Sequence, residues 1–73
     1  MANKNEKLTF IAKNIAKFRK QKKLSQTQLA IKLNISREHI AKIETGLRHP
    51  SLPLVIDIAE TLNIEAKDLF DFK

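Results

Sequence analysis

The sequence predicts an all-α protein folded as a compact bundle of five helices. Apolar residues recur at helical spacing, and no stretch alternates between apolar and polar residues as a strand does. One six-residue pattern occurs at 24–29, 35–40 and 64–69. It consists of an apolar residue, a capping residue, three mostly polar residues and a second apolar residue, and it predicts the start of a helix at each place. The chain has 73 residues with one Gly and two Pro, so we expect a single domain over residues 1–73. Whether residues 1–7 form a flexible basic arm is left open.

The first helix is expected over about residues 5–22. Its apolar residues fall on one face at the spacing of an amphipathic helix, and lysines lie between them. The apolar residues are Leu8, Ile11, Ile15 and Phe18, and the lysines are Lys13, Lys17 and Lys20. This helix is therefore expected to pack one side on the core and to turn a basic side to solvent.

The later helices begin at capping residues. Ser25 and Ser36 are strong N-caps, and Gln28 completes a capping box with Ser25. Ser51 is expected to cap a fourth helix, and Glu65 is a weaker cap whose charge suits a helix start.

The helix ends are marked by residues that tolerate a left-handed backbone, namely Asn34, Gly46 and Asn63. The four later helices are accordingly expected over about 26–33, 37–44, 52–62 and 66–71.

The second and third helices are joined only by the three residues "NIS" at 34–36, so they must cross sharply. A tight crossing of this kind is a helix-turn-helix, and small Ala30 permits the close approach. The buried contacts are expected from Leu29, Leu33, Ile35, Ile40 and Ile43. The residues left without a role in the core are Arg37, Glu38, His39, Ala41 and Lys42.

An exposed helix start of this kind fits the major groove of double-stranded DNA, where residues near its N-terminus reach base edges. Arg37 and Lys42 can bond guanine, Glu38 can accept from the amino group of cytosine, and each good pair contributes about 1–3 kcal/mol of discrimination. His39 is interpreted as a groove or phosphate contact, with a solvated helix residue as the alternative. The candidate base-reading residues are thus Arg37, Glu38, His39 and Lys42.

Phosphate contacts are expected around this helix. The free backbone N–H groups at the start of the second helix, beside Ser25 and Gln26, form an anion site. Ser36 at the start of the third helix, and Thr45 and Arg48 just past its end, complete the expected phosphate-contacting set.

The net charge of +6 is unevenly distributed along the chain. Residues 1–23 carry eight Lys or Arg against one acidic residue, giving +7; residues 24–50 carry four against two, giving +2; residues 51–73 carry two against five, giving −3. A basic front and an acidic back suggest a polyanion approaching from one side, although a solubilising basic face would have the same composition.

The composition gives little support to other classes of site. There is no Cys, and His39 and His49 have no third ligand nearby, so neither a metal nor a cofactor is expected. No nucleophile, base and orienting group can be assembled from the Ser, His and Asp positions, so we expect no catalytic residue and no enzyme. No apolar run approaches the roughly 20 residues of a membrane span, so we expect a cytoplasmic protein without a membrane partner.

The stretch "LSQTQLAIKLNISREHIAKIETGLRHPSLPLVIDIAETLNI" at 24–64 resembles the lambda-repressor-like helix-turn-helix domain of the Cro and Xre type. The similarity runs from about Ile15 to Phe70. Its marks are Arg19, "SQTQLA", the Ile35-Ser36 turn, "IETG", the "HPS" loop and "LNI" before the last helix.

This resemblance implies roles for individual residues. Gln26 would hold a phosphate, and Arg19 and Glu44 would form an internal ion pair of structural importance. The base-reading positions of the family fall on Arg37, Glu38 and Lys42. Lys23 stands where Gly is common in the family, and a left-handed backbone there would strain it by about 1 kcal/mol.

We therefore expect a sequence-specific double-stranded DNA-binding transcriptional regulator, a small repressor or controller, with no small-molecule effector. A homodimer would present two reading helices roughly 34 Å apart on a palindromic operator. Leu69, Phe70 and the fourth helix are one candidate interface; core closure by Phe70 and a frayed Phe72 are the alternative. Two other functions remain open: an antitoxin with autoregulatory DNA binding, and a helical module that binds protein instead of DNA.

Overall fold

The computed structural model describes residues 4–71, which contain five α-helices and no strand. The helices are α1 (Lys4–Gln21), α2 (Gln26–Leu33), α3 (Arg37–Glu44), α4 (Leu52–Thr61) and α5 (Ala66–Leu69). The helical fold class is as predicted, and α2 and α3 have the expected bounds. Residues 4–7, left open as an arm, belong to α1, and residues 1–3 lie outside the described part of the chain.

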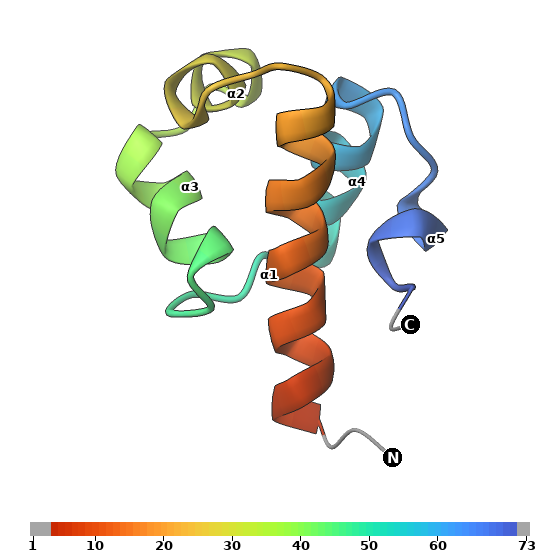
Figure 1. Ribbon diagram of the computed structural model, residues 1–73. Coiled ribbons are helices and arrows are strands. Elements are labelled where there is room, and N and C mark those ends of the chain that lie inside the picture. The colour runs from red at the N-terminus through yellow and green to blue at the C-terminus, as the bar shows by residue number, and fades with distance from the viewer. Residues whose placement is uncertain (1–3, 72–73) are drawn as a thin grey trace.

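The long helix α1 lies between two groups of helices. Figure 1 shows α3 on one side of α1 and α5 on the other. α1 packs against both of them, α2 packs against α3 and α4, and α4 packs against α5. The turn between α2 and α3 makes these two helices cross sharply, as the short connection predicts (Figure 1).

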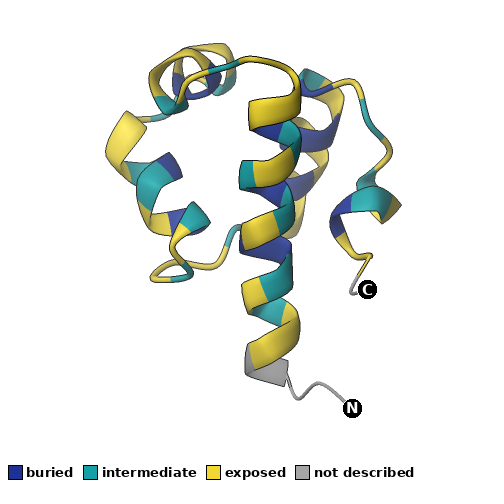
Figure 2. Ribbon diagram, viewed as in Figure 1, coloured by how far each residue is buried: buried dark blue, intermediate teal, exposed yellow. Residues whose placement is uncertain are grey.

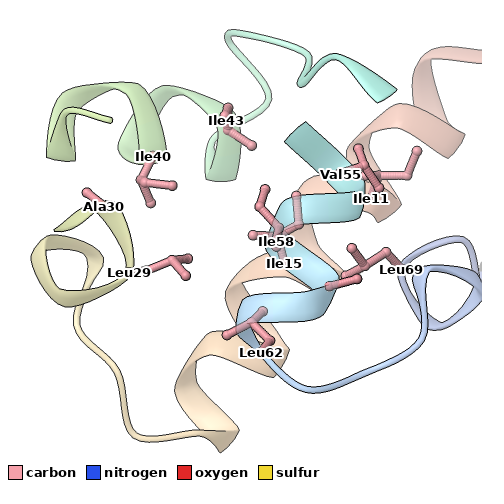
Figure 3. Packing of buried hydrophobic residues seen from close by; sticks show 11 residues of the cluster. Ile11, Ile15, Leu29, Ala30, Ile40, Ile43, Val55, Ile58, Leu62 and Leu69 are labelled. Atoms are coloured by element: carbon pink, nitrogen blue, oxygen red, sulfur yellow. The ribbon is translucent and has the colours of Figure 1, made fainter. Parts of the chain in front are cut away.

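The core receives side chains from every helix (Figure 3). Ile15 of α1 and Ile58 of α4 both belong to this cluster and are completely buried. The other large side chains with less than 2% exposure are Leu29, Ile40, Ile43, Leu62 and Leu69. Burial of each contributes about 1.5–3 kcal/mol, so this cluster is the main source of stability in a small domain.

The C-terminal segment bears on the two alternatives for Leu69 and Phe70. Leu69, which one alternative places in a dimer interface, has 0% exposure and belongs to the core. The side-chain amide Nδ2 of Asn14 donates to the carbonyl oxygens of Leu69 and Asp71, at 3.1 and 2.9 Å. α5 ends at Leu69 and not at residue 71, and Asn14 of α1 bonds the carbonyls at this end of the chain. Phe70 is 40% exposed, and Phe72 lies outside the described residues.

The predicted serine caps and left-handed turns are present, whereas the Glu65 side chain makes no cap hydrogen bond and the Asp68 Oδ2 accepts from the Glu65 N–H at 3.1 Å. The Ser25 Oγ accepts from the Gln28 N–H at 3.0 Å, and the Gln28 Oε1 accepts from the Ser25 N–H at 2.8 Å, which completes the capping box. Asn34 has a φ of 58° and Lys23 a φ of 59°, both left-handed. Lys23 therefore has the strained backbone that a non-Gly residue is expected to have there.

The described residues can be searched for membrane-spanning helices and for clusters of metal ligands. None of the helices in this part of the chain is long and apolar enough to cross a membrane. Within residues 4–71, no three His, Cys, Asp or Glu side chains come together as metal ligands.

Candidate nucleic-acid interface

The buried side of α3 fixes which of its residues face outward. Ile40 and Ile43 are completely buried, so the opposite side of the helix carries Glu38 and Lys42, followed by Thr45 at the helix end. Figure 2 shows the exposed residues of α3 on the side turned away from α1. The predicted division between core and surface residues is thus present. His39 is half-buried at the edge of this surface.

Ser36 sets the start of α3. Its Oγ accepts from the backbone N–H of His39 at 3.0 Å, which is the expected N-cap bond. Arg37 and Glu38 follow at once, so their side chains lie at the N-terminal end of the helix. The cap therefore positions the two charges that would enter a groove first.

Glu38 and Lys42 are paired with each other on the outward side. The Lys42 Nζ lies 3.1 Å from the Glu38 Oε1, and the two side chains remain 48% and 72% exposed. This contact is an i, i+4 pair along the helix, of a kind worth about 0.3–0.5 kcal/mol. It makes the centre of the outward side electrically neutral, with donor and acceptor side by side.

A buried ion pair fixes the far end of α3. The Arg19 Nε lies 2.7 Å from the Glu44 Oε2, and the Arg19 Nη2 donates to the Glu44 Oε1 at 3.0 Å. The two side chains are only 9% and 6% exposed. The Arg19 Nη1 also donates to the Leu24 carbonyl at 2.8 Å. The predicted internal pair therefore exists, and it ties the end of α1 to the end of α3.

Gln26 connects this pair to the N-terminal end of α3. Its Nε2 donates to the Glu44 Oε1 at 3.1 Å, and its Oε1 accepts from the Arg37 Nη1 at 3.4 Å. Sequence reasoning assigned Gln26 to a phosphate and missed both contacts. No local sequence pattern predicts these two contacts, because Glu44 and Arg37 are 18 and 11 residues away from Gln26 in the chain.

The other candidate phosphate contacts lie at helix ends or in the following loop. Ser25 and Gln26 stand at the start of α2, where the first backbone N–H groups have no partner within the helix. The Thr45 hydroxyl donates to the Lys42 carbonyl at 3.1 Å. Arg48 is exposed in the loop after α3, and its side chain has no hydrogen bond or ion pair within the described part of the chain.

Sequence reasoning left the lysines near the end of α1 without individual roles. Lys20, Lys22 and Lys23 are all exposed in the last turn of α1 and the turn that follows it, directly before Ser25. Their charge therefore lies beside the N-terminus of α2. The run "KQKK" at 20–23 was the available signal for this cluster.

Comparison with known proteins gives consistent matches. A family model described as helix-turn-helix matches residues 15–69. The chain is similar to the immunity repressor protein of Bacillus phage phi105, with 40% identity over 55 residues that cover 75% of this chain and 38% of that protein. It is also similar to the HTH-type transcriptional regulator SlrR of Bacillus subtilis, with 36% identity over 62 residues that cover 84% of this chain and 41% of that protein. The chain thus spans about two fifths of the length of these two relatives.

A solved structure agrees over nearly the whole fold. The restriction-modification controller protein C.AhdI from Aeromonas hydrophila superposes with a TM-score of 0.82 at 32% identity, covering 86% of this chain and 96% of that one. The matching family model extends from the middle of α1 to the end of α5. These relatives are transcriptional regulators and not enzymes. The chain belongs to the Cro- and Xre-type helix-turn-helix family of DNA-binding transcriptional regulators.

Proposed function

We propose that the protein is a sequence-specific regulator that places α3 in the major groove of double-stranded DNA. The observation that carries the proposal is the start of α3, where Arg37, Glu38 and Lys42 are exposed while the same helix is fixed from behind by the buried Arg19–Glu44 pair. A helix with both positive and negative side chains on its outward side suits base recognition. The negative charge of Glu38 would weaken binding to phosphates alone, but it can accept a hydrogen bond from a base.

The side chains divide into two proposed roles. Arg37 and Lys42 bond guanine, Glu38 accepts from cytosine, and His39 contacts the edge of the groove. The phosphate contacts come from Ser25, Gln26, Ser36, Thr45 and Arg48. Gln26 supports both roles, because its Oε1 accepts from the Arg37 Nη1, while its Nε2 donates one hydrogen to the Glu44 Oε1 and keeps a second hydrogen for a phosphate. No metal or small molecule takes part in the proposed binding.

We further propose a homodimer on a palindromic operator. An eight-residue reading helix contacts few base pairs, so one copy would discriminate weakly. Exposed apolar side chains that support self-association are Leu52 and Ile56 of α4, at 65% and 43% exposure, and Phe70, at 40%. Two copies would then read half-sites roughly one DNA turn, 34 Å, apart. The two relatives described above come from a bacterium and a bacteriophage, and the proposed target is DNA, so we place the protein in the cytoplasm.

Selection of binding sites from random duplex DNA tests the proposal. The expected result is a recovered motif with two inverted half-sites, together with a dimer in analytical ultracentrifugation. Arg37→Ala should weaken binding to the preferred site by about 1–3 kcal/mol and relax preference at particular base pairs, whereas Lys67→Ala on α5 should not. Equal losses on all sequences would make Arg37 a phosphate contact.

Failure to recover a motif at physiological salt would overturn the regulator function itself. A chain that selects no DNA but copurifies with a defined protein would support the helical protein-binding module. If the chain selects a DNA motif and also copurifies with a defined protein, and if its gene lies beside a toxin-like gene, the antitoxin alternative is supported.

A further inference from the structure

The outward side of α3 carries a donor and an acceptor held together. The Lys42 ammonium and the Glu38 carboxylate lie 3.1 Å apart, at 48% and 72% exposure. Both therefore keep free hydrogen-bonding capacity towards anything placed against the helix. Arg37 does not neutralise Glu38, because its guanidinium contacts the Gln26 Oε1 instead.

The major-groove edge of a cytosine–guanine pair presents the complementary arrangement. The cytosine N4 amino group donates and the guanine O6 accepts, and the Watson–Crick bond between them has a length of about 2.9 Å. The 3.1 Å separation of the Glu38 and Lys42 atoms matches that spacing. A carboxylate against N4 and an ammonium against O6 would close a ring of four hydrogen bonds, in which each charged group keeps its partner.

The guanine N7 decides between this base pair and adenine–thymine, which also presents an adjacent donor and acceptor. With cytosine–guanine, the Lys42 ammonium meets two acceptors, O6 and N7. With adenine–thymine, the Glu38 carboxylate would meet the lone pair of the adenine N7, and the Lys42 ammonium would meet the thymine methyl group. The paired side chains therefore fit cytosine–guanine better.

We propose that Glu38 and Lys42 act as one unit that reads a single base pair, with cytosine against Glu38 and guanine against Lys42. The inference rests on the proposed function, since it names one base pair within the site that α3 would read. It also explains why a carboxylate lies next to a lysine on this surface: the neutral pair adds little attraction to phosphate but adds discrimination between base edges.

The test starts from the site selected by the wild-type chain, with every position changed to each of the four base pairs in competition binding. The variants are Glu38→Gln, Lys42→Met and the double variant. Each single variant should lower the preference for cytosine–guanine at the same position by about 5- to 150-fold. The double variant should lose little more than either single variant, because both remove the same unit.

Modified bases sharpen the result. An inosine–cytosine pair keeps the major-groove edge of guanine–cytosine and should retain the binding. A diaminopurine–thymine pair keeps the minor-groove amino group but presents the major-groove edge of adenine–thymine, and it should lose the binding. The reverse outcome would place recognition in the minor groove and overturn the inference.

The chain also contains a matched control. Glu65 and Lys67 form another exposed pair, at 3.2 Å with 72% and 80% exposure, so Glu65→Gln and Lys67→Met make the same chemical changes away from α3. These controls should leave base preference unchanged. If Glu38→Gln raises and Lys42→Met lowers binding equally on all sequences, or if the two act at different positions, the inference is wrong while the regulator function stands. If the wild-type chain selects no site, the proposed function fails first.

Discussion

Replacement of Arg19 by Ala tests the ion pair that joins α1 to α3. The change removes three hydrogen bonds, two to the Glu44 carboxylate and one to the Leu24 carbonyl. It leaves the Glu44 carboxylate, which is only 6% exposed, with the Gln26 amide as its remaining side-chain partner. Loss of one member of a buried pair costs about 3–5 kcal/mol, because the other charge stays desolvated.

That loss is large for a chain of 73 residues, whose free energy of unfolding is expected at about 4–11 kcal/mol. At about 4–8 °C per kcal/mol, the melting temperature should fall by about 12–40 °C, so Arg19→Ala should be close to unfolding under mild conditions. Thermal and urea melts followed by far-UV circular dichroism measure both quantities.

Two further variants define what would refute this reasoning. Lys67→Ala removes one member of an exposed pair and should change stability by less than about 1 kcal/mol. The double variant Arg19→Met, Glu44→Leu removes both charges together and should recover much of the loss, because no charge is left buried. A melting temperature for Arg19→Ala within a few degrees of wild type, or an equal loss in Lys67→Ala, would show that the buried pair does not hold the helices together.

Three other changes have direct expectations. Lys23→Gly should raise the free energy of unfolding by about 1 kcal/mol, because it relieves the left-handed backbone at φ 59°, whereas Lys22→Gly should not; stabilisation by both would contradict the strain. Ser36→Ala should cost about 1 kcal/mol in urea melts through loss of the α3 cap, and no loss would show that the cap is dispensable. Ile58→Ala should cost about 2–5 kcal/mol by leaving a cavity in the core, where Ile58 is completely buried, and a smaller loss in calorimetry would mean that the core collapses around the cavity.

Features set by neighbouring residues could be predicted from the sequence. The capping box of Ser25 with Gln28, the Ser36 cap and the left-handed Asn34 all depend on bonds and backbone angles within a few positions. Helical periodicity similarly predicted that Ile40 and Ile43 face the core. Local chemistry thus determined α2, α3 and the turn between them.

Contacts between distant residues could not be predicted in the same way. The Asn14 amide, which ties α1 to the end of α5, bonds carbonyls 55 and 57 residues away. The two partners of Gln26 depend likewise on how α2 crosses α3. The Arg19–Glu44 pair was expected only from resemblance to a family, since no spacing in one sequence points to a contact over 25 residues.

The position of the Arg19–Glu44 pair has a consequence for how such a protein can diverge. Its charges are enclosed behind α3, whereas Arg37, Glu38 and Lys42 on the outward side take little part in holding the helix in place. Substitutions at those three positions should therefore accumulate without unfolding the domain. If α3 reads bases as proposed, the sequence of the bound site could change through these three side chains while the fold stays the same, and new specificities could be engineered by replacing them.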